Sequence, residues 1–180
     1  MSQQETTPDW LLLTGLPGSG KTTVIRHALE RTERRCGGFY TEELRQVGTR
    51  VGFSLKTTEG REAPLAHVAY SRGPRVGKYT VDENVMTDIA IPSIEAARKQ
   101  GLLVVIDEIG KMELLSEDFR RLLDDLAGSR ARVLGSIMYK PNNHADRFKQ
   151  LPFVRLLEVR QDTRAQALQQ VLAWLGEMPS

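Results

Sequence analysis

The stretch that decides the fold is Trp10-Leu11-Leu12-Leu13-Thr14-Gly15-Leu16-Pro17-Gly18-Ser19-Gly20-Lys21-Thr22. Its last eight residues fit G-x-x-x-x-G-K-[ST], the pattern of a phosphate-binding loop, or P-loop. An apolar run precedes the loop, and Val24, Ile25, Ala28 and Leu29 follow it on one face of a predicted helix. Strand, glycine loop and helix is the context in which this pattern binds phosphate, so we expect the chain to bind a nucleoside triphosphate.

Each part of the loop has a chemical reason to contact phosphate. Glycines adopt positive φ without steric cost, which lets the backbone wrap around the β-phosphate, while the helix N-terminus offers unpaired N–H groups. We expect Lys21 to reach the β- and γ-phosphates, Thr22 to ligate Mg²⁺ through its hydroxyl, and Thr23 to lie near the α-phosphate. The predicted binding residues of this segment are Gly15, Leu16, Pro17, Gly18, Ser19, Gly20, Lys21, Thr22 and Thr23.

Composition narrows the class of protein. The 180 residues carry a formal net charge of only +2, which gives no broad electrostatic case for binding nucleic acid or anionic membrane. The single cysteine, Cys36, excludes a disulfide within the chain and fits a reducing compartment. No apolar run is long enough to span a membrane. We therefore expect a cytoplasmic monomer with no membrane or nucleic-acid partner.

The order of predicted elements indicates an α/β fold, with a mainly parallel sheet flanked by helices. Residues 1–9 are expected to be a frayed tail and residues 10–177 a single domain. Within it, residues 37–68 have short strand patterns separated by turn signals, which predicts an inserted antiparallel β-meander. The other expected elements are strands near 10–14, 102–106, 132–137 and 154–159; helices over 22–33, 83–90, 92–100, 116–127 and from 163 onward; and a loop over 70–79.

A second motif follows the predicted strand at 102–106, where an apolar run ends in Asp107-Glu108. In P-loop folds the ligand lies at the carboxyl ends of the strands. Asp107 is suited to hold Mg²⁺, directly or through water. Glu108 points elsewhere and can orient or deprotonate an attacking water. We therefore predict Thr22 and Asp107 as metal ligands, and Lys21 and Glu108 as catalytic residues.

Several blocks occur in an order that resembles the small P-loop nucleoside-triphosphatases, typified by a thermophile enzyme and the human cancer-related nucleoside-triphosphatase. Besides the P-loop, they are Gly38-Phe39-Tyr40-Thr41-Glu42-Glu43, Arg50-Val51-Gly52-Phe53, Gly77-Lys78-Tyr79 and Asp107-Glu108-Ile109-Gly110-Lys111-Met112-Glu113. The resemblance implies a RecA-like fold and slow, Mg²⁺-dependent hydrolysis of several nucleoside triphosphates. It also implies a second nucleotide-contacting segment made of Leu103, Val104, Val105, Ile106, Asp107, Glu108, Ile109 and Gly110.

Other residues have weaker signals. Ser136 ends a predicted strand, where it can bond the γ-phosphate or serve only as a strand-end serine. A cation that stabilises the transition state is also expected. Its candidates are Arg45, Arg50, Arg72, Arg75, Lys78, Lys140 and Arg147, of which the predicted loops favour Lys78 and Lys140. The three histidines show no metal-ligand spacing.

The leading functional hypothesis is an enzyme that hydrolyses ATP, GTP and other nucleoside triphosphates to the diphosphate and phosphate. One alternative is a small nucleotide or metabolite kinase. The size of the chain and the position of the P-loop near its start suit such a kinase equally well. Another is a nucleotide-dependent switch or binding module. The sequence by itself does not choose between water and another phosphoryl acceptor.

Overall fold

The computed structural model describes residues 9–129 and 131–177. It contains one nine-stranded sheet with the strand order β5-β6-β4-β3-β2-β7-β8-β1-β9. The strands are β1 (Trp10–Thr14), β2 (Cys36–Gln46), β3 (Thr49–Thr57), β4 (Glu62–His67), β5 (Arg75–Val76), β6 (Tyr79–Val81), β7 (Leu103–Ile109), β8 (Val133–Ile137) and β9 (Val154–Glu158). The helices are α1 (Lys21–Arg31), α2 (Ile91–Lys99), α3 (Glu117–Ala127), α4 (Asn143–Lys149) and α5 (Arg164–Glu177).

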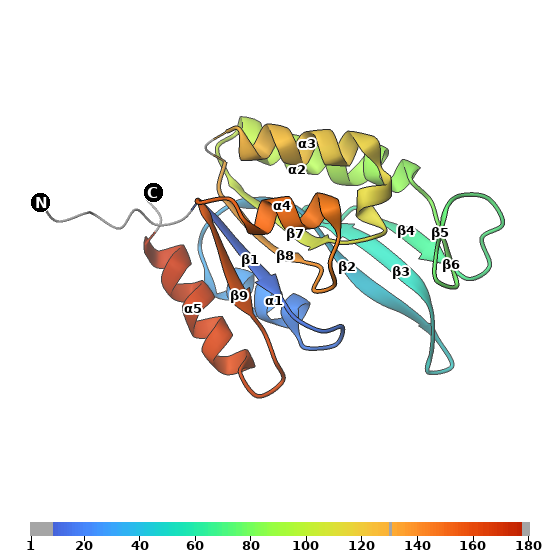
Figure 1. Ribbon diagram of the computed structural model, residues 1–180, viewed down its shortest axis with the longest axis horizontal. Coiled ribbons are helices and arrows are strands. Elements are labelled where there is room, and N and C mark those ends of the chain that lie inside the picture. The colour runs from blue at the N-terminus through green and yellow to red at the C-terminus, as the bar shows by residue number, and fades with distance from the viewer. Residues whose placement is uncertain (1–8, 130, 178–180) are drawn as a thin grey trace, which may run out of the picture.

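Five neighbouring strands, β2, β7, β8, β1 and β9, are parallel and carry helices on both faces (Figure 1). Side chains alternate between the two faces of a strand. Trp10 and Leu12 therefore lie in one core with α2, α3 and α4, whereas Leu11 and Leu13 lie in the other with α1 and α5. This double burial explains why β1 up to Leu13 and β7 up to Ile106 are continuously apolar in sequence.

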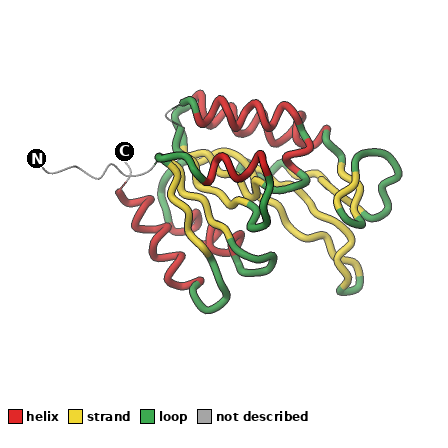
Figure 2. The backbone as a smooth tube through the Cα atoms, in the orientation of Figure 1, coloured by secondary structure: helices red, strands yellow, loops and turns green. Residues whose placement is uncertain are grey.

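The other half of the sheet is antiparallel and contains the predicted meander as β2, β3 and β4. The meander is not set apart from the parallel half, because β2 pairs with β7 on one side and with β3 on the other. Beyond Tyr40, which is in register with Asp107, β2 and β3 extend past the parallel strands as a long hairpin (Figure 2). The hairpin thus starts beside the carboxyl end of β7.

Three sequence expectations differ from the structure. The predicted loop over 70–79 contains β5 and the start of β6, which form a small hairpin. Helix α4 was not expected, although Asn142 caps it by accepting hydrogen bonds from the backbone N–H groups of His144 and Ala145. The expected break before Pro92 is wrong, because Ile91 is helical and the π-helical turn η1 (Met86–Ala90) runs directly into α2.

The cap expected at Ser116 is confirmed, because its hydroxyl accepts a hydrogen bond from the Phe119 N–H at the start of α3. A 3₁₀ turn, η2 (Glu113–Leu115), connects β7 to this cap. Within the residues that the structure describes, no helix combines the length and the apolar character needed to cross a lipid bilayer. Of the tail expected at residues 1–9, only Asp9 is among the described residues.

Candidate active site

The glycine loop connects β1 to α1, and its three glycines, Gly15, Gly18 and Gly20, all have positive φ. At Gly15 φ is +146°, and an added Cβ would lie 2.3 Å from the Val159 carbonyl oxygen. Gly20 is the N-cap of α1 with φ 103° and ψ 19°, in the left-handed region that favours glycine. The sequence pattern therefore forms the predicted strand, loop and helix, with the loop directed toward the carboxyl edge of the parallel strands.

Lys21 folds back over the loop. Its ammonium group donates a hydrogen bond of 3.1 Å to the Gly15 carbonyl oxygen and lies 3.8 Å from a carboxylate oxygen of Glu108. The side chain is only 8% exposed, so its charge sits beside the loop in a poorly hydrated position. Lys21 thus connects the P-loop to β7 across β8, which is the link between the two sequence motifs.

Asp107 is buried at the carboxyl end of β7. It accepts a hydrogen bond from the Ser136 hydroxyl of β8, and the Thr22 hydroxyl also bonds to its carboxyl group. Burial raises the pKa of Asp107, while these two hydrogen bonds and the charge of Lys21 lower it. Ser136, considered for a role at the γ-phosphate, donates its hydroxyl hydrogen bond to the predicted metal ligand, and its role at the phosphate stays a prediction.

The residues around Asp107 fit a magnesium ion. One oxygen of Asp107, Oδ2, is buried and has no hydrogen-bond partner among the described residues, and the Thr22 hydroxyl lies on the same carboxyl group. Across residues 9–129 and 131–177 no group of three or more His, Cys, Asp or Glu side chains could hold a metal. Mg²⁺ characteristically binds through one or two carboxylates together with water and substrate phosphates, which is the ligand set that this arrangement leaves room for.

Glu108 differs from Asp107 in exposure and in partners. Its side chain is 30% exposed and faces Lys21. Burial raises the pKa of Glu108, the charge of Lys21 lowers it, and the nearby Asp107 raises it further. Two adjacent carboxylates therefore have separate environments, one enclosed by hydroxyls and one open toward the loop.

Glu113 lies in η2 next to this pair and was not among the site residues predicted from the sequence. Its carboxyl group is buried and accepts hydrogen bonds from its own backbone N–H and from that of Gly110. An added Cβ on Gly110 would lie 2.9 Å from a Glu113 oxygen and 3.3 Å from a Glu108 oxygen, so the three residues are packed together. Burial, followed by the charge of Glu108, raises the pKa of Glu113 to about 8. The only sequence signal for Glu113 was its place in the block Asp107 to Glu113.

The structure separates the predicted nucleotide-binding residues of β7 into two groups. Asp107 and Glu108 reach the P-loop, whereas the apolar residues have their side chains in the two cores: Leu103, Val104, Val105, Ile106 and Ile109. The direct contact of these five residues and of Gly110 with nucleotide stays a prediction. Thr23 is exposed on the first turn of α1.

Three of the cation candidates are paired with carboxylates. Arg45 and Arg50 form ion pairs with Glu43, and Arg147 forms one with Asp124. Arg75 and Lys78 flank the turn between β5 and β6. Since β6 is four strands from β7, this places them roughly 19 Å from it at about 4.8 Å per strand. Lys140 is exposed in the segment between β8 and α4, and is the candidate that the topology keeps near the site.

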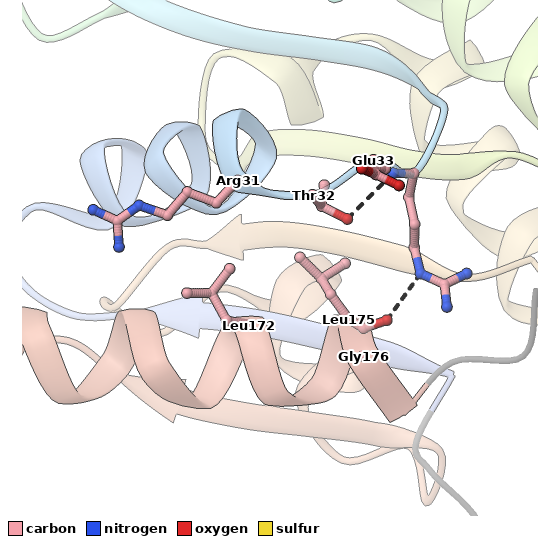
Figure 3. Close-up of a pocket in the computed structure, with 7 residues that line it drawn as sticks. Arg31, Thr32, Glu33, Leu172, Leu175 and Gly176 are labelled. Carbon is pink, nitrogen blue, oxygen red and sulfur yellow. Dashed lines mark hydrogen bonds between the residues drawn. The ribbon is translucent and has the colours of Figure 1, made fainter.

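A pocket of about 510 Å³ lies at the other end of α1 from the P-loop. Figure 3 shows it between the C-terminal ends of α1 and α5, where Arg34 donates a hydrogen bond of 2.8 Å to the Leu175 carbonyl oxygen. Its lining residues are Arg31, Thr32, Glu33, Arg34, Leu172, Leu175 and Gly176. It shares no lining residue with the candidate active site.

The fold and the glycine loop place the chain in the P-loop class of nucleotide-binding proteins. Residues 10–172 match the model of the NTPase family, and the chain belongs to that family. The chain is 38% identical over 165 residues to nucleoside-triphosphatase THEP1 of Thermotoga sp. (strain RQ2), an alignment that covers 92% of this chain and 94% of the relative.

Two solved structures have the same fold. The crystal structure of THEP1 from the hyperthermophile Aquifex aeolicus has a TM-score of 0.85 and 32% identity, covering 92% of this chain and 98% of that one. The solution structure of a human cancer-related nucleoside triphosphatase has a TM-score of 0.77 and 32% identity, covering 94% and 98%. These matches confirm the α/β fold class and the family resemblance.

Proposed function

We propose that the protein hydrolyses nucleoside triphosphates to the diphosphate and phosphate with Mg²⁺ as cofactor. The observation that carries the proposal is the convergence of Lys21, Thr22, Asp107 and Glu108 at one sheet edge, with Lys21 3.8 Å from Glu108. The names of the relatives support the same activity, because both THEP1 and the human protein are called nucleoside triphosphatases.

In this proposal each side chain has one task. The loop amides and Lys21 bind the β- and γ-phosphates. Thr22 and Asp107 hold Mg²⁺, which when bound neutralises charge on the phosphate oxygens. Ser136 fixes the orientation of Asp107 through its hydrogen bond.

Glu108 is assigned to the attacking water. Its carboxylate is partly exposed and faces Lys21, while the Asp107 carboxyl group is buried, bonded to Ser136 and Thr22, and assigned to the metal. The raised pKa of Glu108 makes it a stronger base than a free glutamate, and a catalytic base is most effective when its pKa approaches the working pH. In-line attack then places the water on the side of the γ-phosphate that faces Glu108.

The test is Glu108→Gln, which keeps the shape of the side chain and removes its ability to take a proton. We expect the variant to bind ATP with Mg²⁺ at near wild-type affinity and to lose about 10²-fold or more in phosphate release, the size of a general-base contribution. Lys21→Ala should instead weaken binding and turnover together. Glu95→Gln, an exposed change in α2, is the matched control and should behave as wild type.

Wild-type turnover by Glu108→Gln would overturn the assignment of the base. Incubating the wild-type protein with ATP and a panel of nucleosides and nucleoside monophosphates separates the hydrolase from a kinase. Phosphoryl transfer much faster than phosphate release would contradict hydrolysis as the function.

We further propose that the protein works as a monomer in the cytoplasm. Its single cysteine, which fits a reducing compartment, supports the location. Sedimentation velocity with and without nucleotide tests the monomeric state.

A further inference from the structure

Glu108, the proposed base, lies at an interruption in the pairing of β7 with its neighbours. The parallel register of β7 with β2 ends at Asp107, and its register with β8 is irregular between Ile106 and Ile109. Within the described residues, Glu108 thus has no register partner on either neighbouring strand. The sheet holds the residues before and after Glu108, so the direction of its own side chain has to be set by other contacts.

Two such contacts are present. Lys21 lies 3.8 Å from a carboxylate oxygen of Glu108, but in the proposed function it also reaches the phosphates and does not orient the base alone. The second contact is Gly110, where an added Cβ would lie 3.3 Å from Cγ and Oε1 of Glu108 and 2.9 Å from Oε2 of Glu113. The two carboxyl groups therefore lie on the same side of Gly110.

Both backbone polar groups of Gly110 are bonded to η2. Its N–H donates a hydrogen bond to the Glu113 carboxyl group, and its carbonyl oxygen accepts one of 3.0 Å from the Leu114 N–H. The turn itself is anchored, because Leu114 is buried and its carbonyl oxygen accepts a hydrogen bond of 2.7 Å from the Arg120 guanidinium of α3. Glu113 is thus a fixed acceptor that holds the glycine against which Glu108 packs.

We propose that Glu113 is a positioning residue for hydrolysis, which fixes Gly110 and thereby aims the Glu108 carboxylate at the attacking water. The inference rests on the proposed function and deepens it, because it assigns a task to a buried residue outside the proposed substrate contacts. Burial, followed by the charge of Glu108, raises the pKa of Glu113 to about 8, so near pH 7 its carboxyl group is neutral and does not repel the base. A neutral carboxyl group still accepts the Gly110 hydrogen bond through its carbonyl oxygen.

The kinetics of phosphate release from ATP with Mg²⁺ test the inference. Glu113→Met keeps an unbranched side chain of similar length and removes the carboxyl acceptor for the Gly110 N–H. We expect kcat to fall about tenfold, within the roughly 10²-fold that the base contributes, because small misplacements of a catalytic group are costly. KM and the affinity for a non-hydrolysable ATP analogue should stay as in wild type, since Glu113 lies outside the proposed phosphate and metal contacts.

Two variants are matched to this one. In Glu113→Gln the amide oxygen still accepts the Gly110 hydrogen bond, so most of the wild-type kcat should be kept. Glu117→Met makes the same change at a glutamate of α3 that is 64% exposed, and it should hydrolyse ATP as wild type does.

A double variant separates positioning from a general loosening of the site. If Glu113 acts through Glu108, Glu113→Met should change kcat by less than about twofold when it is added to Glu108→Gln, because two changes that act through one group are not additive. An equal loss of kcat in the wild-type and Glu108→Gln backgrounds would overturn the inference.

Hydrogen exchange at the Gly110 amide, followed by NMR, needs no turnover. This amide should exchange slowly in the wild type and in Glu113→Gln, and roughly tenfold faster in Glu113→Met, the size of one lost hydrogen bond. Rapid exchange of the Gly110 amide in the folded wild-type protein would overturn the inference without recourse to any variant.

The outcomes keep the two proposals apart. Wild-type kcat in Glu113→Met would overturn the positioning role and leave hydrolysis intact. Weaker binding of the ATP analogue at unchanged kcat would place Glu113 on substrate binding and overturn the inference as well. If the wild-type protein releases no phosphate from ATP with Mg²⁺, the proposed function fails, and the inference that rests on it fails with it.

Discussion

At the scale of single residues, Glu113 has the environment least expected from sequence. A carboxyl group buried beside Glu108 and Asp107 loses hydration and meets negative charge, and both effects favour its protonated form. Two backbone N–H groups, of Gly110 and of Glu113 itself, oppose the shift without reversing it. Glu113 is therefore neutral in the folded protein near pH 7, which lets it pack against Glu108 without a full charge.

The shifted pKa predicts how stability depends on pH. The pKa of Glu113 is about 8 when folded, against an ordinary value of 4.5, so between these values the folded protein holds one more proton than the unfolded chain. The free energy of unfolding then falls as pH rises through this window and levels off above it. Glu113→Gln should remove this fall in the free energy of unfolding. Over the whole window between the two pKa values the fall is roughly 4–5 kcal/mol, at about 1.36 kcal/mol per pH unit.

Urea unfolding at pH 5.5 and pH 8.5 measures the effect, with exposed Glu117→Gln as the control. The difference in unfolding free energy between the two pH values should be smaller in Glu113→Gln than in the wild type and in the control. The same pH dependence in all three proteins would contradict the buried, protonated state of Glu113.

At the scale of elements, α4 and the helix around Pro92 show two limits of local patterns. Helix α4 has only seven residues, fewer than a periodic apolar pattern needs to be recognised. Its signal was the cap: the Asn142 side chain bonds two backbone N–H groups, and Asp146 bonds the Asn142 N–H in return. At Pro92 the restriction on the preceding residue is overridden, and Ile91 stays helical with φ −58° and ψ −48°.

Removing the α4 cap should have a measurable cost. Asn142→Ala leaves the N–H groups of His144 and Ala145 without their side-chain acceptor, so we expect a loss of about 1 kcal/mol in unfolding free energy. Asn143→Ala changes the neighbouring exposed residue, which lies inside the helix, and should stay within about 0.5 kcal/mol of wild type. Equal losses in the two variants, measured by urea unfolding, would contradict the capping role.

At the scale of the whole molecule, the proposed site joins separate parts of the sheet. Lys21 and Thr22 begin α1, Asp107 and Glu108 end β7, and Ser136 lies on β8 between β7 and β1. These residues meet only when the strands are assembled in their native order. A ligand that contacts all of them therefore binds the folded protein and not the unfolded chain.

This linkage predicts that Mg²⁺ with a non-hydrolysable ATP analogue raises the melting temperature. At a concentration 100 times the Kd the stabilisation is about 2.7 kcal/mol, which corresponds to roughly 5–10 °C for a chain of this size. Chelating the metal with EDTA should reduce the shift, and Asp107→Asn should lose the part that depends on Mg²⁺. An equal shift with and without EDTA in the wild-type protein would contradict the metal site at Thr22 and Asp107.

Local patterns in the sequence were sufficient for the strands of the parallel half of the sheet, for α1, α3 and α5, and for the principal motifs. The glycine loop requires positive φ at Gly15 and Gly20, which only glycine adopts readily. The apolar runs of β1 and β7 result from the burial of both faces of these strands. The carboxylates of Asp107 and Glu108 follow directly on such a run. Each of these features is encoded within a few residues, because it depends on dihedral angles, on side-chain alternation or on adjacent charges.

Only the tertiary structure decided which residues meet across the sheet. It joined β2 to both halves of the sheet, bonded Ser136 to Asp107, buried Glu113 against Glu108 and laid Arg164 over Gly20. These contacts join separate elements of the fold, and no local period or turn signal records them. They result from the order in which the strands pair and the helices cover both faces, which is determined by packing of the whole chain.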